Sequence, residues 1–325
     1  MLQGKKILIT GGAGFIGSNL CHKFVEQNNE VVCLDNFLTG RRENIKDLIN
    51  KNNFKLLEGD IRDIDTCKKS VKNVDVVFHQ AALGSVPRSI NDPITTNAIN
   101  VSGFLNMLKA SDEEGVSRFV YAASSSTYGD SESLPKIEEK IGNPLSPYAV
   151  TKLVNELYAN VFSNLYSIET IGLRYFNVFG QKQDPEGAYA AAIPRFVKAF
   201  IDYQSPIIHG DGEQSHDFTY IDNVLQANEL AATTENQAAV NQVYNVAFGE
   251  NTTLNELVPL LRELLAKFDA KISEVKIEYG EDRVGDIKHS LASIAKASSL
   301  LEYRPEYSLQ KGLSEAIEWY WNDLK

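Results

Sequence analysis

The sequence contains a tyrosine and a lysine four residues apart, Tyr148 and Lys152, directly after Ser146 and Pro147. Four residues of an α-helix rise about 6 Å, so both side chains would face one side of the helix. A tyrosine with an ordinary pKa of about 10 is a poor base at neutral pH, but a neighbouring ammonium stabilises the phenolate and lowers that pKa. The pair could transfer a proton, or it could be a packed ring beside a solvated lysine. Ser146 as N-cap and Pro147 at the first helical position predict that this helix starts here.

A hydroxyl partner for such a pair is offered by three consecutive serines, Ser124, Ser125 and Ser126, at the end of the apolar segment 117–126. A serine next to a reacting oxygen can hydrogen-bond to it and orient the substrate. Three serines at a strand end could also form a plain polar turn. A cofactor site elsewhere in the chain would favour the chemical interpretation.

Such a site is indicated by the glycines of "ILITGGAGFIGSNL" near the N-terminus. They are Gly11, Gly12, Gly14 and Gly17, between an apolar run and an amphipathic segment. Glycines in this order allow a tight turn and a close approach of the backbone, and the helix N-terminus that follows would face a pyrophosphate. We therefore predict a dinucleotide-binding turn.

The identity of the dinucleotide depends on Asp35, which ends the second apolar run 18 residues past the last of these glycines. A carboxylate here accepts hydrogen bonds from the adenosine ribose and repels a 2′-phosphate, which favours NAD over NADP. Arg41 and Arg42 lie close enough in the sequence to weaken this argument. Asp60 and Ile61, at the end of the third apolar run, are expected at the adenine, or they are ordinary strand-end residues.

These residues would be positioned by a sheet of short parallel strands. Strands are expected at 5–10, 30–35, 54–60, 74–82, 117–126 and 169–176, which are rich in Val, Ile, Leu and Phe and lack polar alternation. Segments with helical spacing between them include 14–28, 94–112 and 147–163. This alternation predicts right-handed crossovers and an α/β fold, a Rossmann doubly wound parallel sheet.

The second part of the chain is less regular. Helices are expected at 190–203, 221–235, 253–267 and 310–322, separated by "FGQKQDPEGAYAAAIP" and "IIHGDGEQSHDF", which we interpret as long loops that serve a site. We expect an NAD-binding domain over residues 1–176 and a smaller, mixed α/β substrate domain over 177–325. The segment near 218–248 is a candidate for returning to the first domain.

Composition argues against several classes of protein. With 325 residues, 43% hydrophobic and 23% charged, the chain is typical of soluble globular proteins, and no apolar stretch is long enough for a membrane span. The net charge of −11 argues against non-specific nucleic-acid binding. The three cysteines are too few and too scattered for a disulfide framework, and the histidines lack metal-ligand spacing. We expect no metal, no nucleic acid, no membrane and a cytoplasmic location.

Together, the glycine turn, the serines and "YAVTK" resemble the extended short-chain dehydrogenase/reductase family over nearly the whole chain. Within it, "SSSTYGD", "SPYAVTK", "GLRYFNVFG" and "GDGEQSHDF" resemble NAD-dependent nucleotide-sugar 4-epimerases of the UDP-glucose/UDP-galactose type. The segments "HQAALGSVPRSI" and "QDPEGAYAAAIP" are similar to the subgroup that acts on UDP-N-acetylhexosamines, UDP-GlcNAc and UDP-GalNAc.

The resemblance implies a role for each member of the Tyr-Lys-Ser set. Tyr148 would remove the proton of the sugar 4-hydroxyl while a hydride passes from carbon 4 to NAD. The 4-keto sugar would turn over and receive the hydride on its opposite face. Ser124 would hydrogen-bond to the 4-oxygen, and Ser125 would help to hold the keto form. Lys152 would bind the nicotinamide ribose and, with the positive nicotinamide, lower the pKa of Tyr148.

The same resemblance implies two sets of binding residues. For NAD they are Gly11, Gly14, Phe15, Ile16, Gly17, Asp35, Asn36, Gly40, Asp60, Ile61, Gln80, Ala81, Ala82, Asn100, Tyr148, Lys152, Tyr175 and Val178. For the UDP-sugar they are Gly84, Ser85, Ser124, Ser125, Tyr148, Asn177, Ala191, His216, Arg283, Asp286 and Ser290. Arg283 would bind the diphosphate of UDP and Asp286 its ribose.

Several positions bear on the reaction and the sugar. Dehydratases of this family need an Asp-Glu pair where this chain has Ser125 and Ser126, and decarboxylases keep a Glu there, so neither reaction is expected. His216 stands where the family commonly has an arginine that contacts the diphosphate, which leaves the affinity for UDP and its pH dependence open. At Ser290 a tyrosine would restrict the pocket to unacetylated hexoses, whereas a serine leaves room for an acetamido group.

We therefore predict a UDP-N-acetylhexosamine 4-epimerase that uses bound NAD. UDP-glucose/UDP-galactose and a C6-carboxylated hexosamine remain as alternative substrates. Two other functions stay open, a net sugar-nucleotide dehydrogenase or reductase and a non-catalytic NAD(H) sensor, although such sensors commonly lack the Tyr or the Lys. Family members usually form homodimers through helices that correspond to 94–112 and 147–163, so a homodimer is expected.

Overall fold

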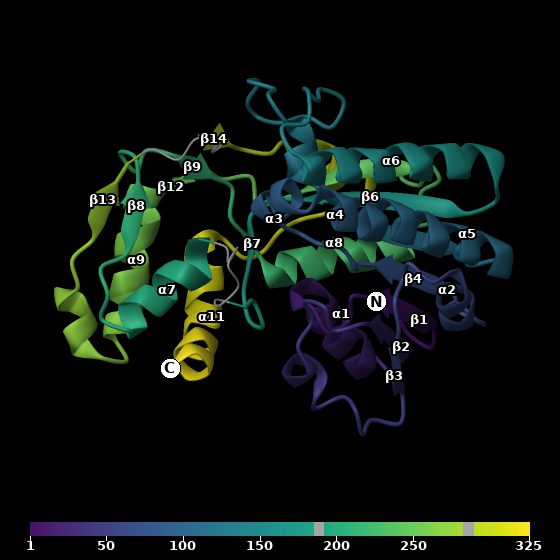
Figure 1. The fold of residues 1–325 in the computed structure, drawn as a ribbon, viewed down its shortest axis with the longest axis horizontal. Coiled ribbons are helices and arrows are strands. Elements are labelled where there is room, and N and C mark those ends of the chain that lie inside the picture. Colours follow the sequence, from purple (N-terminus) through teal and green to yellow (C-terminus); the bar gives the residue numbers. More distant parts are fainter. Residues whose placement is uncertain (185–191, 282–288) are drawn as a thin grey trace.

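The computed structural model describes residues 1–184, 192–281 and 289–325. Its centre is a seven-stranded parallel sheet with the strand order β11-β6-β5-β4-β1-β2-β3 (Figure 1). The strands are β1 (Lys6–Thr10), β2 (Glu30–Asp35), β3 (Phe54–Glu58), β4 (Val76–His79), β5 (Arg118–Ser124), β6 (Glu169–Tyr175) and β11 (Gln242–Val246). The order reverses between β1 and β4, as in doubly wound folds, so the expected Rossmann sheet is confirmed.

Side chains of the central strands alternate between hydrophobic cores on the two faces of the sheet. In β1, Ile7 and Ile9 belong to one core and Leu8 belongs to the other. In β2, Cys33 and Val32 divide in the same way. Both faces are covered, and for this reason these strands show no polar alternation in the sequence.

Helices cover both faces of this sheet. The first core includes residues of α1 (Phe15–Glu26) and α8 (Ile221–Thr233), and the second includes residues of α2 (Ile64–Ser70), α5 (Phe104–Glu114) and α6 (Pro147–Leu165). Helices α6 and α8 lie on opposite sides of β6 (Figure 1). Because parallel strands end at one edge of a sheet, the glycine turn after β1 and the serines after β5 share that edge.

The helical segment expected at 94–112 is interrupted. It comprises α4 (Pro93–Asn97), a π-helical turn (Ala98–Gly103) and α5. A short helix that the sequence did not reveal, α3 (Val86–Asn91), precedes it. With 6 residues, α3 is too short to show an amphipathic repeat.

Small sheets and further helices follow in the later part of the chain. The helices are α7 (Ala192–Ile201), α9 (Leu254–Ala266), α10 (Ala295–Leu300) and α11 (Leu309–Leu324). The sheets are β7 (Val178–Phe179) with β10 (Thr219–Tyr220), β8 (Ile207–His209) with β13 (Glu278–Gly280), and β12 (Thr252–Thr253) with β9 (Ser215–His216) and β14 (His289–Ser290). The expectation that "IIHGDGEQSHDF" is a loop is therefore wrong in part, because it contains β8 and β9. Strands this short leave no periodic pattern in the sequence.

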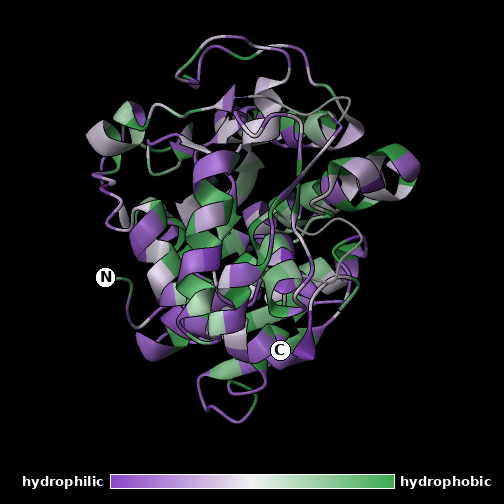
Figure 2. Cartoon of the chain, turned by 90° about the vertical axis from the view of Figure 1, so that its left-hand side faces the viewer, coloured by the Kyte–Doolittle hydropathy of each residue, from purple (hydrophilic) through white to green (hydrophobic). Residues whose placement is uncertain are grey.

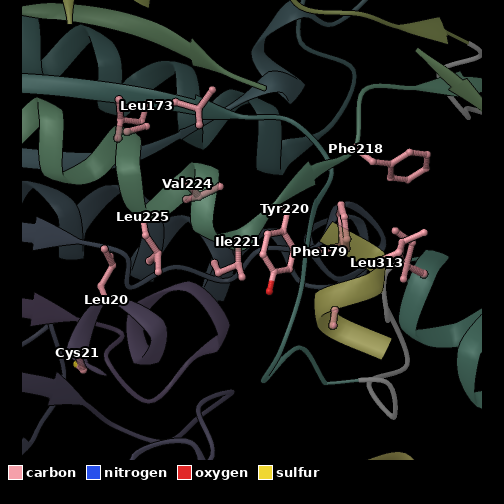
Figure 3. Packing of buried hydrophobic residues seen from close by; sticks show 14 of the residues in the cluster. Leu20, Cys21, Leu173, Phe179, Phe218, Tyr220, Ile221, Val224, Leu225 and Leu313 are labelled. Atoms are coloured by element: carbon pink, nitrogen blue, oxygen red, sulfur yellow. The ribbon is translucent and has the colours of Figure 1, made fainter. Parts of the chain in front are cut away.

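A hydrophobic core continues from the large sheet into the C-terminal helices. Leu20 of α1 and Leu225 of α8 belong to the same cluster as Phe179, Tyr220 and Leu313 (Figure 3). The helices of this region are amphipathic, so hydrophilic and hydrophobic residues both appear along them in Figure 2. The C-terminal part therefore packs directly against the helices of the large sheet.

One strand and one helix from the later part of the chain pack into or against the large sheet. Strand β11 pairs in parallel with β6, and α8 contacts β5, β6 and β11. Both come from the region around 218–248, which is a candidate for returning to the first domain. The division into domains at 1–176 and 177–325 stays a prediction.

Candidate active site

A cavity of about 500 Å³ opens at the edge where β1 and β4 end. Because the strand order reverses between these strands, this is the crevice in which doubly wound sheets bind nucleotides. Most residues predicted to bind the cofactor line it: Gly11, Gly14, Phe15, Ile16, Gly17, Asp35, Asn36, Asp60, Ile61, Gln80, Ala81, Ala82, Tyr148, Lys152, Tyr175 and Val178. Gly84, Ser124 and Asn177 from the predicted sugar site line it as well.

The turn after β1 requires glycine at two positions. Gly11 has a φ of +66°, and a Cβ there would lie 2.8 Å from the backbone of Ala81. A Cβ on Gly17 would lie 2.1 Å from the carbonyl oxygen of Gly11. Gly14 is the N-cap of α1, and among the described residues no side chain caps this helix. Its first N–H groups are therefore available to a pyrophosphate, which fits a dinucleotide.

Asp35 is buried at the end of β2, and its carboxylate holds the glycine turn. Oδ2 accepts a hydrogen bond from the Ala13 N–H at 2.9 Å, and Oδ1 accepts one from the Phe37 N–H at 2.8 Å. Burial raises the pKa of this carboxyl, and the backbone hydrogen bonds oppose the rise. A carboxylate has about four acceptor sites, so capacity remains for a ribose hydroxyl.

The two arginines that follow Asp35 have anionic partners. Arg42 pairs with Glu58 at 2.5 Å, and its guanidinium lies 4.0 Å from the centre of the Phe37 ring. Arg41 lies 3.9 Å from Asp184. These contacts weaken the argument for a 2′-phosphate and leave Asp35 to favour NAD.

Tyr148 and Lys152 line the cavity from the first turns of α6, which begins where the sequence predicts. The Ser146 hydroxyl accepts a hydrogen bond from the Ala149 N–H at 3.2 Å and caps the helix. Lys152 Nζ lies 5.9 Å from the centre of the Tyr148 ring and donates a hydrogen bond to the Ala122 carbonyl at 2.8 Å. An ammonium has three donors, so the others remain for a cofactor hydroxyl.

Burial shifts the pKa of both groups. The pKa of Lys152 falls to about 8 because the buried ammonium is desolvated, and Glu156 opposes this fall. Burial raises the pKa of Tyr148, and a hydrogen bond with Ser124 opposes the rise. In the protein chain without its cofactor, desolvation of the phenolate therefore dominates, and the lowering of the Tyr148 pKa expected with a bound nicotinamide stays a prediction.

The three serines occupy different places. Ser124 is buried at the end of β5 and lines the cavity, and Ser125 and Ser126 begin a 3₁₀ turn that runs from Ser125 to Tyr128. Ser126 donates to Ser124 Oγ from its N–H at 3.1 Å and from its hydroxyl at 2.9 Å. Ser125, which was expected at the keto sugar, is not among the described residues that line the cavity.

The predicted sugar side joins the end of β6 to strands β9 and β14. Asn177 Nδ2 donates to Ser290 Oγ at 3.2 Å and to the Asp217 carbonyl at 3.3 Å. The Asp217 N–H donates to the Ser290 carbonyl at 2.8 Å. Asn177 and Ser290 are 113 residues apart in the sequence, so the fold brings this side of the site together.

A sequence profile of the NAD-dependent epimerase/dehydratase family matches residues 7–247. The chain belongs to this family. A solved structure of UDP-N-acetylglucosamine 4-epimerase from Methanobrevibacter ruminantium M1, in complex with UDP-N-acetylmuramic acid, is 36% identical with a TM-score of 0.92 and covers 99% of this chain and 100% of its own. UDP-glucuronic acid 4-epimerase from Bacillus cereus, in complex with UDP-glucuronic acid and NAD, is 31% identical with a TM-score of 0.88 and covers 98% and 100%. UDP-glucose 4-epimerase of Mycolicibacterium smegmatis is 32% identical over 319 residues, 98% of this chain and 99% of its own.

These similarities confirm the expected family, the enzyme class of NAD-dependent UDP-sugar 4-epimerases, and NAD as the cofactor. For this member of the epimerase/dehydratase family, the glycine turn, the uncapped α1 and Asp35 form the cradle that NAD needs. The sugar is not determined by similarity, because relatives named for N-acetylglucosamine, glucose and glucuronic acid all resemble the chain.

Two residues predicted to bind NAD are not among the described residues that line the cavity. Asn100 is buried in the π-helical turn, where its Oδ1 accepts a hydrogen bond from the Leu83 N–H at 2.8 Å and its Nδ2 donates to Thr151 Oγ1 at 3.1 Å. It therefore bridges the wall of the cavity to α6. Gly40 lies against Asp35, since a Cβ there would be 2.9 Å from both carboxylate oxygens.

Several of the predicted sugar residues do not line the cavity in the part of the chain that the structure describes. Ser85 caps α3, where its hydroxyl accepts a hydrogen bond from the Arg88 N–H at 3.2 Å. His216 is half-buried in β9, with its ring centre 5.9 Å from that of Phe218. Neither these two nor Ser290 are among the described residues that line the cavity. Ala191, Arg283 and Asp286 lie outside the described residues.

Sequence reasoning missed the polar residues that hold the predicted ones in place. Asn228 of α8 is fully buried, and its Nδ2 donates to the Tyr175 hydroxyl at 3.0 Å. Gln80 Nε2 donates to the same hydroxyl at 3.2 Å. On the other side, the Ser89 hydroxyl accepts a hydrogen bond from the Tyr148 N–H at 3.0 Å. The partners are 53, 95 and 59 residues apart, so no local motif signals these contacts.

Metal clusters and membrane-spanning helices are not found in residues 1–184, 192–281 and 289–325. No group of three or more His, Cys, Asp or Glu side chains among the described residues could hold a metal ion. Within those ranges, none of the helices combines the length and the apolar character needed to cross a membrane. Cys21, Cys33 and Cys67 are buried thiols.

Proposed function

We propose that this UDP-sugar 4-epimerase interconverts UDP-GlcNAc and UDP-GalNAc. The observation that carries the proposal is the room beside Gly84. Gly84 lines the cavity, and a Cβ on it would meet no described atom within 4 Å. Ser290 accepts a hydrogen bond from Asn177, and its side chain is only a hydroxymethyl group at the predicted sugar side. An acetamido group is larger than a hydroxyl at carbon 2, and open space on this side favours the acetylated sugars.

Tyr148 is proposed as the group that takes and returns the proton of the 4-hydroxyl. It lines the cavity together with Ser124, its hydrogen-bond partner, so one substrate oxygen can contact both. Bound NAD supplies the hydride exchange at carbon 4. Lys152 keeps a positive charge near the Tyr148 ring, which stabilises the phenolate when the proton moves.

The serine turn favours epimerisation over elimination. Loss of a hydroxyl from carbon 6 needs an acid and a base near this turn. Ser125 and Ser126 supply neither, and the Ser126 hydroxyl is engaged with Ser124. The 4-keto sugar therefore finds no group at these positions that would remove a further proton.

For the nucleotide, we propose that Arg283 binds the diphosphate, Asp286 binds the ribose and Ala191 lies at the sugar, as the family resemblance implies. His216 and Ser290 are register partners in β9 and β14, which supports a place for His216 beside the bound UDP-sugar.

UDP-glucose/UDP-galactose and a sugar with a carboxylate at carbon 6 are the alternative substrates. The similarity to UDP-glucose 4-epimerase of M. smegmatis supports the first, and that to UDP-glucuronic acid 4-epimerase of B. cereus supports the second. Glucose, galactose and glucuronic acid carry only a hydroxyl at carbon 2 and do not need the room beside Gly84, whereas a C6-carboxylated hexosamine would use it.

The test offers purified protein, without added cofactor, UDP-GlcNAc, UDP-glucose and UDP-glucuronate in separate reactions. Proton NMR follows the anomeric signals of the 4-epimers. We expect conversion of the acetylated sugar alone, abolished in Tyr148→Phe and retained in Tyr158→Phe, which lies on the same helix but not among the described residues of the cavity wall. Equal or faster conversion of another sugar would overturn the substrate assignment and keep the epimerase.

Two further functions give different results in this assay. A net dehydrogenase would accumulate NADH absorbance when NAD is added in excess. An NAD(H) sensor would bind the cofactor and convert none of the three sugars. Either outcome would contradict the proposed function.

We also propose that the protein is a homodimer. Four apolar side chains, Val150, Leu157, Val161 and Leu165, are exposed along α6. An apolar stripe on one helix supports burial against a second copy. Light scattering should give twice the chain mass of 36.1 kDa, and Leu157→Glu should give the monomer. A cytoplasmic location stays a prediction.

A further inference from the structure

The oxygen of Ser124 receives two hydrogen bonds from one residue. The Ser126 N–H donates to Ser124 Oγ at 3.1 Å, and the Ser126 hydroxyl donates to it at 2.9 Å. A hydroxyl group has two lone pairs and one proton. With both lone pairs engaged by Ser126, Ser124 can form its remaining hydrogen bond only as a donor.

The partner for that remaining bond lies on α6. Ser124 and Tyr148 both line the cavity, and the Ser124 hydroxyl lowers the pKa of Tyr148. This effect opposes that of burial, and a serine that can only donate to the tyrosine oxygen stabilises the phenolate in the same direction. If Ser124 had a free lone pair, it could instead accept a hydrogen bond from the neutral phenol, and the bond would then favour the protonated tyrosine.

The turn that carries Ser126 is also held by other bonds. Thr127 Oγ1 donates to the Ser124 carbonyl at 2.9 Å, and the Gly129 N–H donates to the Ser126 carbonyl at 3.2 Å. Ser126 is half-buried, whereas Thr127 is fully buried. Removal of the Ser126 hydroxyl therefore leaves the backbone of the turn in place and takes away one donor to Ser124.

We propose that Ser126 is a positioning residue that directs the Ser124 proton towards Tyr148 and the reacting oxygen of the substrate. This inference rests on the proposed function, in which Ser124 and Tyr148 act at the 4-oxygen of the sugar. Ser126 touches neither reactant. It acts by keeping Ser124 a donor, so that the serine supports the phenolate that must accept the proton.

The test compares Ser126→Ala with Ser126→Thr as NAD-loaded holoenzymes, with the UDP-sugar that the wild type converts. Loss of one ordinary hydrogen bond, about 1 kcal/mol, corresponds to a fall in kcat of about fivefold in Ser126→Ala. Its KM should change little, and the acid limb of its pH profile should move to higher pH, because Tyr148 becomes harder to ionise. Ser126→Thr keeps a hydroxyl donor and should restore both kcat and the profile.

Two further variants separate positioning from simple support of the turn. Thr127→Val removes the hydrogen bond to the Ser124 carbonyl. It should lower the melting temperature without moving the acid limb of the pH profile. In a Ser124→Ala background, adding Ser126→Ala should cause no further loss. An unchanged pH profile in Ser126→Ala, or an equal loss in the Ser124→Ala background, would overturn the proposal for Ser126. Wild-type kcat in Ser124→Ala would overturn the proposed role of Ser124 as well.

Discussion

The carboxylate of Glu156 and the guanidinium of Arg174 form a two-point ion pair between α6 and β6. Arg174 Nε lies 2.9 Å from Oε1 and a terminal guanidinium nitrogen lies 2.7 Å from Oε2, and the two side chains are 8% and 4% exposed. Glu156 stands one helical turn after Lys152 and supports its ammonium against desolvation. One helical turn beyond Lys152, α6 therefore carries a carboxylate that forms a buried ion pair with β6.

Glu156→Gln should destabilise the protein by about 3 kcal/mol, because it leaves a buried guanidinium without its anion. It should also move the alkaline limb of kcat to lower pH, since Lys152 loses the neighbouring negative charge. Urea unfolding and a pH profile measure the two effects. Glu58→Gln breaks the exposed pair with Arg42 and is the control, with a loss of at most about 1 kcal/mol. Equal losses in both variants would contradict a special role for the buried pair.

The pKa of Lys152, about 8, predicts that turnover declines in mildly alkaline solution. This value lies below the ordinary lysine pKa of about 10.4, so the folded protein loses the proton first as pH rises. The positive charge beside Tyr148 is then lost, and kcat should fall above about pH 8. Lys152→Arg stays charged, and its residual kcat should show no fall in this range. A fall at the same pH in that variant would assign the alkaline limb to another group.

Asp217 predicts a change of stability with pH. It is fully buried and accepts hydrogen bonds from the N–H groups of Phe248, Gly249 and Ala292 at 3.1, 3.1 and 3.3 Å. Burial raises its pKa to about 6, with a smaller effect from Glu250. Because the folded-state pKa exceeds the ordinary value of about 3.9, the stability that the bound proton contributes is complete below about pH 4 and is lost as pH rises through about 6.

Asp217→Asn cannot titrate, so its free energy of unfolding should rise relative to that of the wild type between about pH 5 and about pH 7, because only the wild type loses stability over this range. Urea unfolding at both values measures the difference. The comparison does not depend on the absolute cost of the substitution. A difference that stays constant with pH would show that Asp217 does not carry this dependence.

Asn228 lies on α8, outside the described cavity wall, and we expect its substitution to change the affinity for NAD. Asn228→Leu should weaken NAD binding by about tenfold, because the buried Tyr175 hydroxyl and the Gln80 amide lose a partner. Calorimetry on protein stripped of NAD measures the affinity. Thr233→Ala, on the same helix, removes a hydroxyl that bonds only to Glu229 among the described contacts, and it should leave the affinity unchanged. Unchanged affinity in Asn228→Leu would mean that the network does not position the site.

The central strands were predictable because each is an apolar run buried on both faces. The first was expected at 5–10 and is β1, Lys6–Thr10. Strand β11 was not predicted, because it lies at the edge of the sheet and has no continuous apolar run. Its first residues, Gln242 and Val243, are only half-buried. Strands β9 and β14 have two residues each, too few for any period, although they carry His216 and Ser290.

The sequence by itself determined the local devices of the site. The glycine turn, the Ser146 cap and the shared face of Tyr148 and Lys152 follow from spacing, since each depends on residues within about one helical turn. Only the tertiary structure decided what surrounds them. Burial opposes the expected ionisation of Tyr148, and Ser124, Glu156 and Asn228 gain their roles from partners on other elements. Charge, burial and hydrogen-bond direction depend on what the fold brings together, and spacing along the chain carries no information about that.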